Sequence, residues 1–136
     1  MRQLAVLDTD VVSILFRNDS RAAFYEHEVA GRNCFISFMT VAELDRWTLR
    51  HDWGPAKRSL LEGFVSKFTV YSSDRQLSFR WAEVVEAGRK LGRPVNCADA
   101  WIAATALELD CPLVTHNFKD FQALPGLIVR SHGGLT

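Results

Sequence analysis

The chain has little cysteine, no excess of either charge and no long apolar segment. Its three cysteines, Cys34, Cys97 and Cys111, form no CxxC pair, so we expect neither a disulfide framework nor a zinc site, and a reducing cytoplasm fits better. Basic and acidic residues both number 16, so total charge does not indicate a strongly basic nucleic-acid binder. No apolar run is long enough for a signal peptide or a membrane span. Glycine-rich phosphate loops and the G-x-S-x-G nucleophile elbow are also absent.

Short apolar runs alternate with helical patterns along the chain. We expect strands near residues 4–7, 34–38, 69–71, 112–114 and 127–129, with helices between them, and a loose tail at residues 131–136. Strands that are separated by helices pair in parallel and are covered on both faces. The sequence therefore predicts a single domain over residues 1–136, an α/β/α sandwich around a central, mostly parallel sheet of four to five short strands.

Acidic residues stand at or just beyond the edges of these apolar runs. They are Asp8, which Asp10 follows closely, then Glu43, Asp99 and Asp120. Ligands of open α/β sheets bind beyond the carboxyl ends of the strands, so these side chains can converge there. Carboxylates that are brought together repel one another, unless a hard cation such as Mg²⁺ or Mn²⁺ lies among them. The pattern therefore indicates metal-assisted phosphate chemistry.

Structural roles compete with this interpretation at the helix starts. Thr9 or Asp10 can cap the first helix, and residues 40–43 match a capping box in which the Glu43 side chain reaches back to the helix start. Asn96 can cap a later helix whose first turn holds Asp99, where a negative charge favours the helix dipole. Spacing alone leaves both kinds of role open for Glu43 and Asp99.

Four segments, taken together, resemble a known family. They are LAVLDTDVVS, TVAEL, ADAWIAATAL and LVTHNFKDF, and they span nearly the whole chain. In order and separation they resemble the motifs of the PIN-domain ribonucleases, most closely the VapC toxins of bacterial toxin–antitoxin pairs. The resemblance implies a PIN-like fold and a cytoplasmic endoribonuclease that hydrolyses phosphodiester bonds with Mg²⁺, or with Mn²⁺ in its place. It also implies three partners: an RNA substrate, a small antitoxin protein and a second copy of the chain in a homodimer.

The resemblance also implies which residues form the site. The catalytic residues would be Asp8, Glu43, Asp99, Asn117 and Asp120, with Asp8 and Asp99 as the metal ligands. Many relatives have aspartate where this chain has Asn117, so the fourth position is open between Asn117 and Asp120. Polar side chains beside the acids match further family positions and could bind water or metal: Thr9, Thr40, Asn96 and Thr115.

Other interpretations remain open. The segment LDTDVV resembles the D-x-D motif of haloacid-dehalogenase-type phosphatases, with Asp8 as nucleophile and Asp10 as acid and base, although that family's later lysine and paired aspartates are hard to place. An inactive PIN-like binding module is favoured only by Asn117, and structure-specific DNA cleavage is a third alternative. A basic cluster is either a solvated helix face or a substrate-facing patch: Arg46, Arg50, His51, Lys57 and Arg58.

Overall fold

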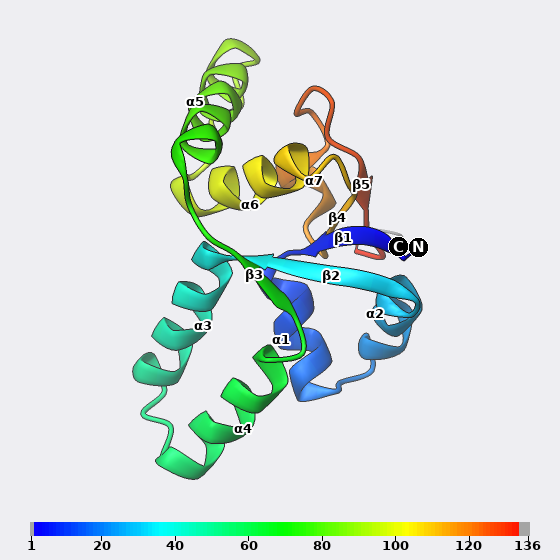
Figure 1. Ribbon diagram of the computed structural model, residues 1–136, viewed down its shortest axis with the longest axis vertical. Coiled ribbons are helices and arrows are strands. Elements are labelled where there is room, and N and C mark those ends of the chain that lie inside the picture. The colour runs from blue at the N-terminus through cyan, green and yellow to red at the C-terminus, as the bar shows by residue number, and fades with distance from the viewer. Residues whose placement is uncertain (1, 134–136) are drawn as a thin grey trace.

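A five-stranded parallel sheet forms the centre of the protein, as the computed structural model shows for residues 2–133 (Figure 1). The strands are β1 (Gln3–Leu7), β2 (Arg32–Ser37), β3 (Thr69–Tyr71), β4 (Leu113–Val114) and β5 (Val129–Arg130), in the order β3-β2-β1-β4-β5. Every neighbouring pair is parallel. The predicted parallel sheet is confirmed.

Helices cover both faces of the sheet. Figure 1 shows α1 (Thr9–Arg17), α2 (Ala22–Val29), α3 (Phe38–Arg50) and α4 (Pro55–Val65) on one side. On the other side lie α5 (Arg75–Lys90), α6 (Cys97–Glu108) and the short α7 (Phe118–Phe121). The predicted α/β/α sandwich is therefore confirmed.

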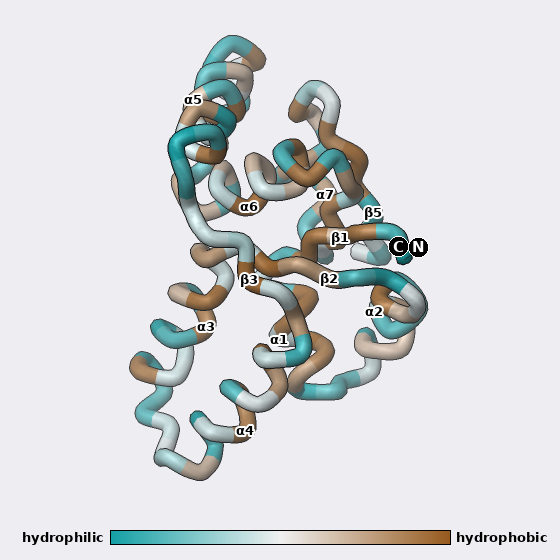
Figure 2. The backbone as a smooth tube through the Cα atoms, viewed as in Figure 1, coloured by the Kyte–Doolittle hydropathy of each residue, from teal (hydrophilic) through white to brown (hydrophobic). Residues whose placement is uncertain are grey.

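The central strand β1 contributes to both hydrophobic cores. Ala5 and Leu7 pack into the core under α1 to α4, whereas Val6 packs into the core under α5 and α6, and all three are fully buried. Successive side chains of a strand point to opposite faces, and a strand covered on both faces is therefore apolar throughout. Figure 2 shows this as a continuous hydrophobic stretch along β1.

The strand order has one reversal point, which fixes where a ligand can bind. From β1 the chain proceeds to β2 and β3 on one side, and then crosses to β4 and β5 on the other. β1 and β4 are therefore neighbours at the switch point, and a crevice forms outside their carboxyl ends. Asp8 follows β1 directly, and Thr115 follows β4.

Several predicted helix ends need correction. α3 begins at Phe38, and the side chain of Ser37 caps it by accepting a hydrogen bond from the Met39 amide. The predicted capping box at residues 40–43 is therefore wrong. Asp8 caps α1, in place of Thr9 or Asp10. The predicted cap at Asn96 is confirmed, because its side chain accepts a bond from the amide three residues later, and Asp74 caps α5 in the same way.

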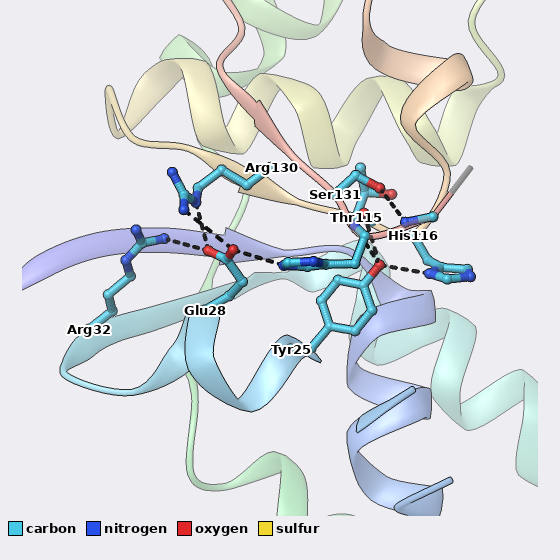
Figure 3. A network of polar contacts seen from close by, with 9 residues as sticks. Tyr25, Glu28, Arg32, Thr115, His116, Arg130 and Ser131 are labelled. Carbon is cyan, nitrogen blue, oxygen red and sulfur yellow. Dashed lines mark hydrogen bonds and ion pairs between the residues drawn. The ribbon is translucent and has the colours of Figure 1, made fainter. Parts of the chain in front are cut away.

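The C-terminal segment is held more firmly than the sequence predicts. Glu28 is only 8% exposed, and its carboxylate accepts bonds from Arg130 Nε at 2.6 Å and His132 Nε2 at 3.0 Å. Arg32 lies 3.6 Å from the same carboxylate, and the His132 amide donates to the Tyr25 hydroxyl (Figure 3). The prediction of a loose tail is therefore wrong for residues 131–133, while residues 134–136 lie outside the described part.

Two sequence-based expectations about the surface and the thiols can also be checked. Within residues 2–133 no helix combines the length and apolarity needed to cross a bilayer. All three cysteines are free thiols, as their spacing predicts.

Candidate active site

An open cleft of about 350 Å³ lies at the switch point between β1 and β4. Its lining combines residues that are far apart in the sequence: Asp8, Thr9, Asp10, Ser13, Glu43, Leu44, Trp47, Asp99 and Asn117. Four of the five predicted catalytic residues are among them. The fold therefore brings together the acids that the sequence singles out, at the edge of the sheet where they were expected.

Asp8 forms the floor of the cleft. It is 5% exposed, and its two carboxylate oxygens accept hydrogen bonds from the Thr9 amide at 2.8 Å and from the Thr115 hydroxyl at 2.7 Å. Burial, and next the charge of Asp10, raise the pKa of Asp8 well above its ordinary range. A buried carboxylate that has like charges around it attracts a cation strongly.

Asp10 also belongs to the cleft, although the predicted catalytic set omits it. Its Oδ2 accepts a bond from the His116 amide at 3.1 Å, whereas its buried Oδ1 has no hydrogen-bond partner within residues 2–133. Burial raises the pKa of this carboxyl as well. The D-T-D spacing directly after a buried strand was the available signal, because it places a second acid in the first turn of α1.

Glu43 lies in the second turn of α3, not in its first. This position excludes the capping role that competed with a functional one. Its Oε1 accepts a 2.6 Å hydrogen bond from the Thr9 hydroxyl. Thr40 Oγ1 lies 3.0 Å from Thr9 Oγ1, and since a hydroxyl carries one proton, Thr40 donates to Thr9 while Thr9 donates to Glu43. Two threonines in a chain of hydrogen bonds thus hold Glu43 in the wall of the cleft.

Asp99 lies both in the first turn of a helix, where its structural role was expected, and in the cleft, where its functional role was expected. It stands in the first turn of α6, where Asn96 donates to its Oδ2 at 2.9 Å. Burial, and next the charge of Asp120, raise the pKa of Asp99 to about 6. The charges of Glu43 and Asp10 raise the pKa of Asp99 in the same direction, so acids from α1, α3 and α7 all lie near enough to act on this residue of α6.

The fourth position divides between two hollows. Asn117 lines the cleft with Asp8, Glu43 and Asp99. Asp120, on α7, instead lines a neighbouring hollow of about 220 Å³ that shares Asp99 with the cleft. The structure thus brings Asn117 into the cleft and places Asp120 behind Asp99.

A network behind the cleft fixes the segment that follows β4. The Tyr25 hydroxyl lies 2.6 Å from His116 Nδ1 (Figure 3). The Thr115 hydroxyl donates to Asp8, and the His116 amide donates to Asp10. The same two residues therefore contact α2 on one side and the acids on the other. Of the four polar neighbours expected from the sequence, three bond an acid directly and Thr40 does so through Thr9.

The oxygen atoms that could ligate a metal in the cleft suit a hydrated Mg²⁺ ion better than a metal held by protein side chains alone. Within the described part of the chain, no three His, Cys, Asp or Glu side chains are arranged to hold a metal ion by themselves. Mg²⁺ keeps several of its waters and is commonly bound by one or two carboxylates. The unpartnered Oδ1 of Asp10 and the mutual repulsion of Asp8 and Asp99 are the features that such a cation would relieve.

Residues 5–127, from β1 to just before β5, match the PIN domain family. This chain belongs to the PIN domain family. The haloacid-dehalogenase alternative is thereby disfavoured.

Individual proteins extend the similarity. The ribonuclease VapC1 of Haemophilus influenzae strain R2866 is 27% identical over 124 residues, which cover 90% of this chain and 92% of that protein. VapBC2 of Rickettsia felis, solved bound to a DNA fragment from their promoter, has a TM-score of 0.83 at 23% identity, over 95% of this chain and 98% of that chain. VapBC-5 of Mycobacterium tuberculosis, a member of the VapBC family of toxin-antitoxin systems, has a TM-score of 0.66 at 25% identity, over 96% of this chain and 98% of that chain.

Proposed function

We propose that the protein is an endoribonuclease that depends on a divalent cation, Mg²⁺ or Mn²⁺. The observation that carries the proposal is the convergence of Asp8, Asp10, Glu43 and Asp99 in one cleft at the switch point of the sheet. Their pattern of burial and mutual repulsion is the one that a cation relieves. The similarity to a protein named a ribonuclease supports RNA as the substrate.

The residues divide the work of the site. Asp8 and Asp99 would hold the cation, which when bound supplies an activated water and neutralises charge on the phosphate. Thr115 and the His116 amide keep the carboxylates of Asp8 and Asp10 facing the cleft. Thr9 holds Glu43 in place to orient a water or the attacking nucleophile.

The Asn117 side chain has a different part in this proposal. An amide is a neutral ligand and also a hydrogen-bond donor, so Asn117 can contact a phosphate oxygen where a carboxylate would repel it. Asp120, from the neighbouring hollow, would act on the cleft through its charge on Asp99.

Replacing Asp8 and Asp99 individually with asparagine tests the proposal. We expect each variant to lose about 10²-fold or more of RNA cleavage in Mg²⁺, because a cation contributes several kcal/mol to charge stabilisation. Circular dichroism should show an unchanged fold. Asp45→Asn, on the exposed side of α3, is the matched control and should cleave like the parent.

The outcomes separate the alternatives. RNA cleavage by Asp8→Asn at the parental rate would refute the proposal. Calorimetric titration of the parent with Mg²⁺ or Mn²⁺ that shows no binding would favour an inactive binding module. Cleavage of a matched DNA strand in preference to RNA would favour the DNA alternative.

We also propose that a small antitoxin protein holds this activity in check and that the chain forms a homodimer in the cytoplasm. Similarity to a member of a toxin–antitoxin family supports the antitoxin, and the free thiols suit a reducing compartment. Co-expression with the product of a neighbouring small open reading frame should give a complex that copurifies and does not cleave RNA. Light scattering of the purified chain should give twice the mass of 15.4 kDa, and a monomeric mass would refute the homodimer.

A further inference from the structure

One face of α3 continues from the cleft as a positively charged surface. Arg46, Arg50 and His51 are exposed on this face and flank the half-buried Trp47, and we call these four residues the α3 basic strip. Positions 43, 46, 47, 50 and 51 are three, four, seven and eight residues apart, so they share one side of the helix. The strip therefore begins one turn beyond Glu43.

The strip lines a hollow of its own that is continuous with the cleft. This second hollow, of about 320 Å³, is lined by Glu43, Arg46, Trp47, Arg50 and His51. Glu43 and Trp47 line both hollows. From Glu43 to Arg50 the helix rises about 10 Å. A ligand that lies along α3 would thus reach the acids without leaving a continuous groove.

The charges of the strip are not neutralised by neighbouring acids. Within residues 2–133 neither Arg46 nor Arg50 forms an ion pair, whereas Arg80 and Arg89 on α5 pair with glutamates three residues away on their own helix or on α6. These two arginines of α5 are thus paired with nearby glutamates, as is usual on a solvated helix face, whereas in the described part of the chain the arginines of α3 are not. Unpaired arginines are free to bind phosphate oxygens, for which their planar donor groups are suited.

The aromatic side chain sits among the cations. The Arg17 guanidinium, from α1, lies 5.9 Å from the centre of the Trp47 ring, and Trp53 supports the same ring at 4.8 Å. His51 Nδ1 lies 3.0 Å from the Trp47 carbonyl, which can only accept, so Nδ1 carries the proton and Nε2 remains available to a ligand. Basic side chains around a supported aromatic ring are the usual surface for single-stranded nucleic acid.

We propose that the α3 basic strip binds single-stranded RNA and leads it to the acids, with Arg46 and Arg50 on the backbone and a base stacked on Trp47. The inference rests on the proposed function. A cleft lined by acids repels a polyanion, so the attraction must come from outside it. Among the described residues, Arg93 and Lys119 in the hollow beside Asp99 also lack ion pairs, but the α3 basic strip is the adjoining surface that combines unpaired arginines with an aromatic ring. Sequence-specific recognition of RNA commonly uses unpaired bases stacked on aromatic rings.

Binding of a fluorescein-labelled single-stranded RNA, followed by anisotropy in Mg²⁺, tests the strip without cleavage if Asp8→Asn is the background. Arg46→Gln with Arg50→Gln should weaken binding about tenfold and reduce the slope of log affinity against log salt by about 1.4, since each phosphate contact on a single strand contributes about 0.7. The matched control is Arg2→Gln with Lys67→Gln, which removes two exposed charges at the amino edge of the sheet. The control should change binding less than twofold.

Trp47 separates stacking from charge. Trp47→Leu should weaken RNA binding about tenfold with an unchanged salt slope, and Trp47→Phe should restore most of the binding, because base stacking needs an aromatic ring. In the cleaving protein, the double arginine variant should raise KM and leave kcat near the parental value, as expected for uniform binding.

The result that overturns the proposal is equal RNA binding by the strip variant and the control variant, which would leave α3 to a protein partner. This outcome is distinct from failure of the proposed function. If the parent cleaves no RNA but the strip variant loses RNA binding as described, the nuclease proposal fails and the binding surface stands.

Discussion

Replacing Asp99 with asparagine should stabilise the cation-free protein. Burial and the charge of Asp120 raise the pKa of this carboxyl from 3.8 to about 6 in the folded protein. A pKa difference of about 2 corresponds to about 3 kcal/mol at neutral pH. Asp99 is partly exposed, so solvent screening reduces the expected gain to on the order of 1–2 kcal/mol. For a chain of this length that is a rise in Tm of about 4–7 °C.

The pH dependence of the gain identifies its cause. Because the folded pKa of Asp99 lies above the unfolded value, its protonated form favours folding, and stability is lost as pH rises from about 4 through about 6. The advantage of Asp99→Asn should therefore be small at pH 4.5 and complete at pH 7.5. Scanning calorimetry of both proteins in EDTA at several pH values measures it.

Two controls make the experiment decisive. Asp45→Asn removes an exposed acid from α3 and should change the free energy of unfolding by about 0.5 kcal/mol or less, as a surface substitution does. Adding Mg²⁺ should stabilise the parent more than Asp99→Asn, because a ligand stabilises only the form that binds it. A gain that is equal at pH 4.5 and pH 7.5, or no gain at all, would refute the electrostatic explanation.

Two further substitutions test the supports of the site and of the fold. Thr9→Val removes the donor to Glu43, and steady-state kinetics should show RNA cleavage about 10–100-fold slower with RNA binding retained. Normal cleavage would mean that Glu43 needs no orientation. Glu28→Gln removes the charge that pairs with Arg130 and should cost about 2–3 kcal/mol in urea unfolding at pH 7. Hydrogen bonds from Arg130 lower the pKa of Glu28, so the stability that this pair provides is present above about pH 4.5 and is lost as pH falls through the lower folded pKa. An equal deficit at pH 3 and pH 7 would contradict this account.

The predictable part of the fold is the part that depends on local pattern. The apolar run at residues 4–7 predicted β1 to within a residue, because a buried strand is apolar. The edge strand β3 was predicted at its observed bounds although it is largely exposed, because its residues are β-branched or aromatic. The caps at Asp74 and Asn96 were predictable for a similar reason, since a cap acts on amides only two or three residues away.

The helix start at α3 shows how a local pattern misleads. Thr40 and Glu43 have the spacing of a capping box, but Ser37 also has a capping side chain and lies at the end of β2. Strand pairing determines which residue caps α3, because β2 ends where its pairing with β3 ends, at Ser37 and Tyr71. That pairing joins residues 34 positions apart, so the sequence of residues 37–43 does not indicate it.

The omission of Asp10 has a related cause. Its first-turn position favours the cap or dipole role that acids commonly take there. The segment after β4 indicates a further role for Asp10. The His116 amide donates to one oxygen of the Asp10 carboxylate, and the other oxygen is buried without a hydrogen-bond partner within residues 2–133. A contact between residues 10 and 116 cannot be predicted from the sequence around either residue. The short helix α7 and the anchored residues 131–133 were missed for the same reason.

The bond between the Thr115 hydroxyl and Asp8 spans 107 positions of the chain and has a consequence for biosynthesis. Asp8 is translated 107 residues before its orienting partner Thr115. Strand β4, which must insert beside β1, comes equally late. A nascent chain therefore cannot assemble the cleft before β4 and Thr115 have been translated, and a product that ends before β4 lacks it. If the protein cleaves RNA as proposed, a chain that has not yet been extended through β4 and Thr115 cannot do so.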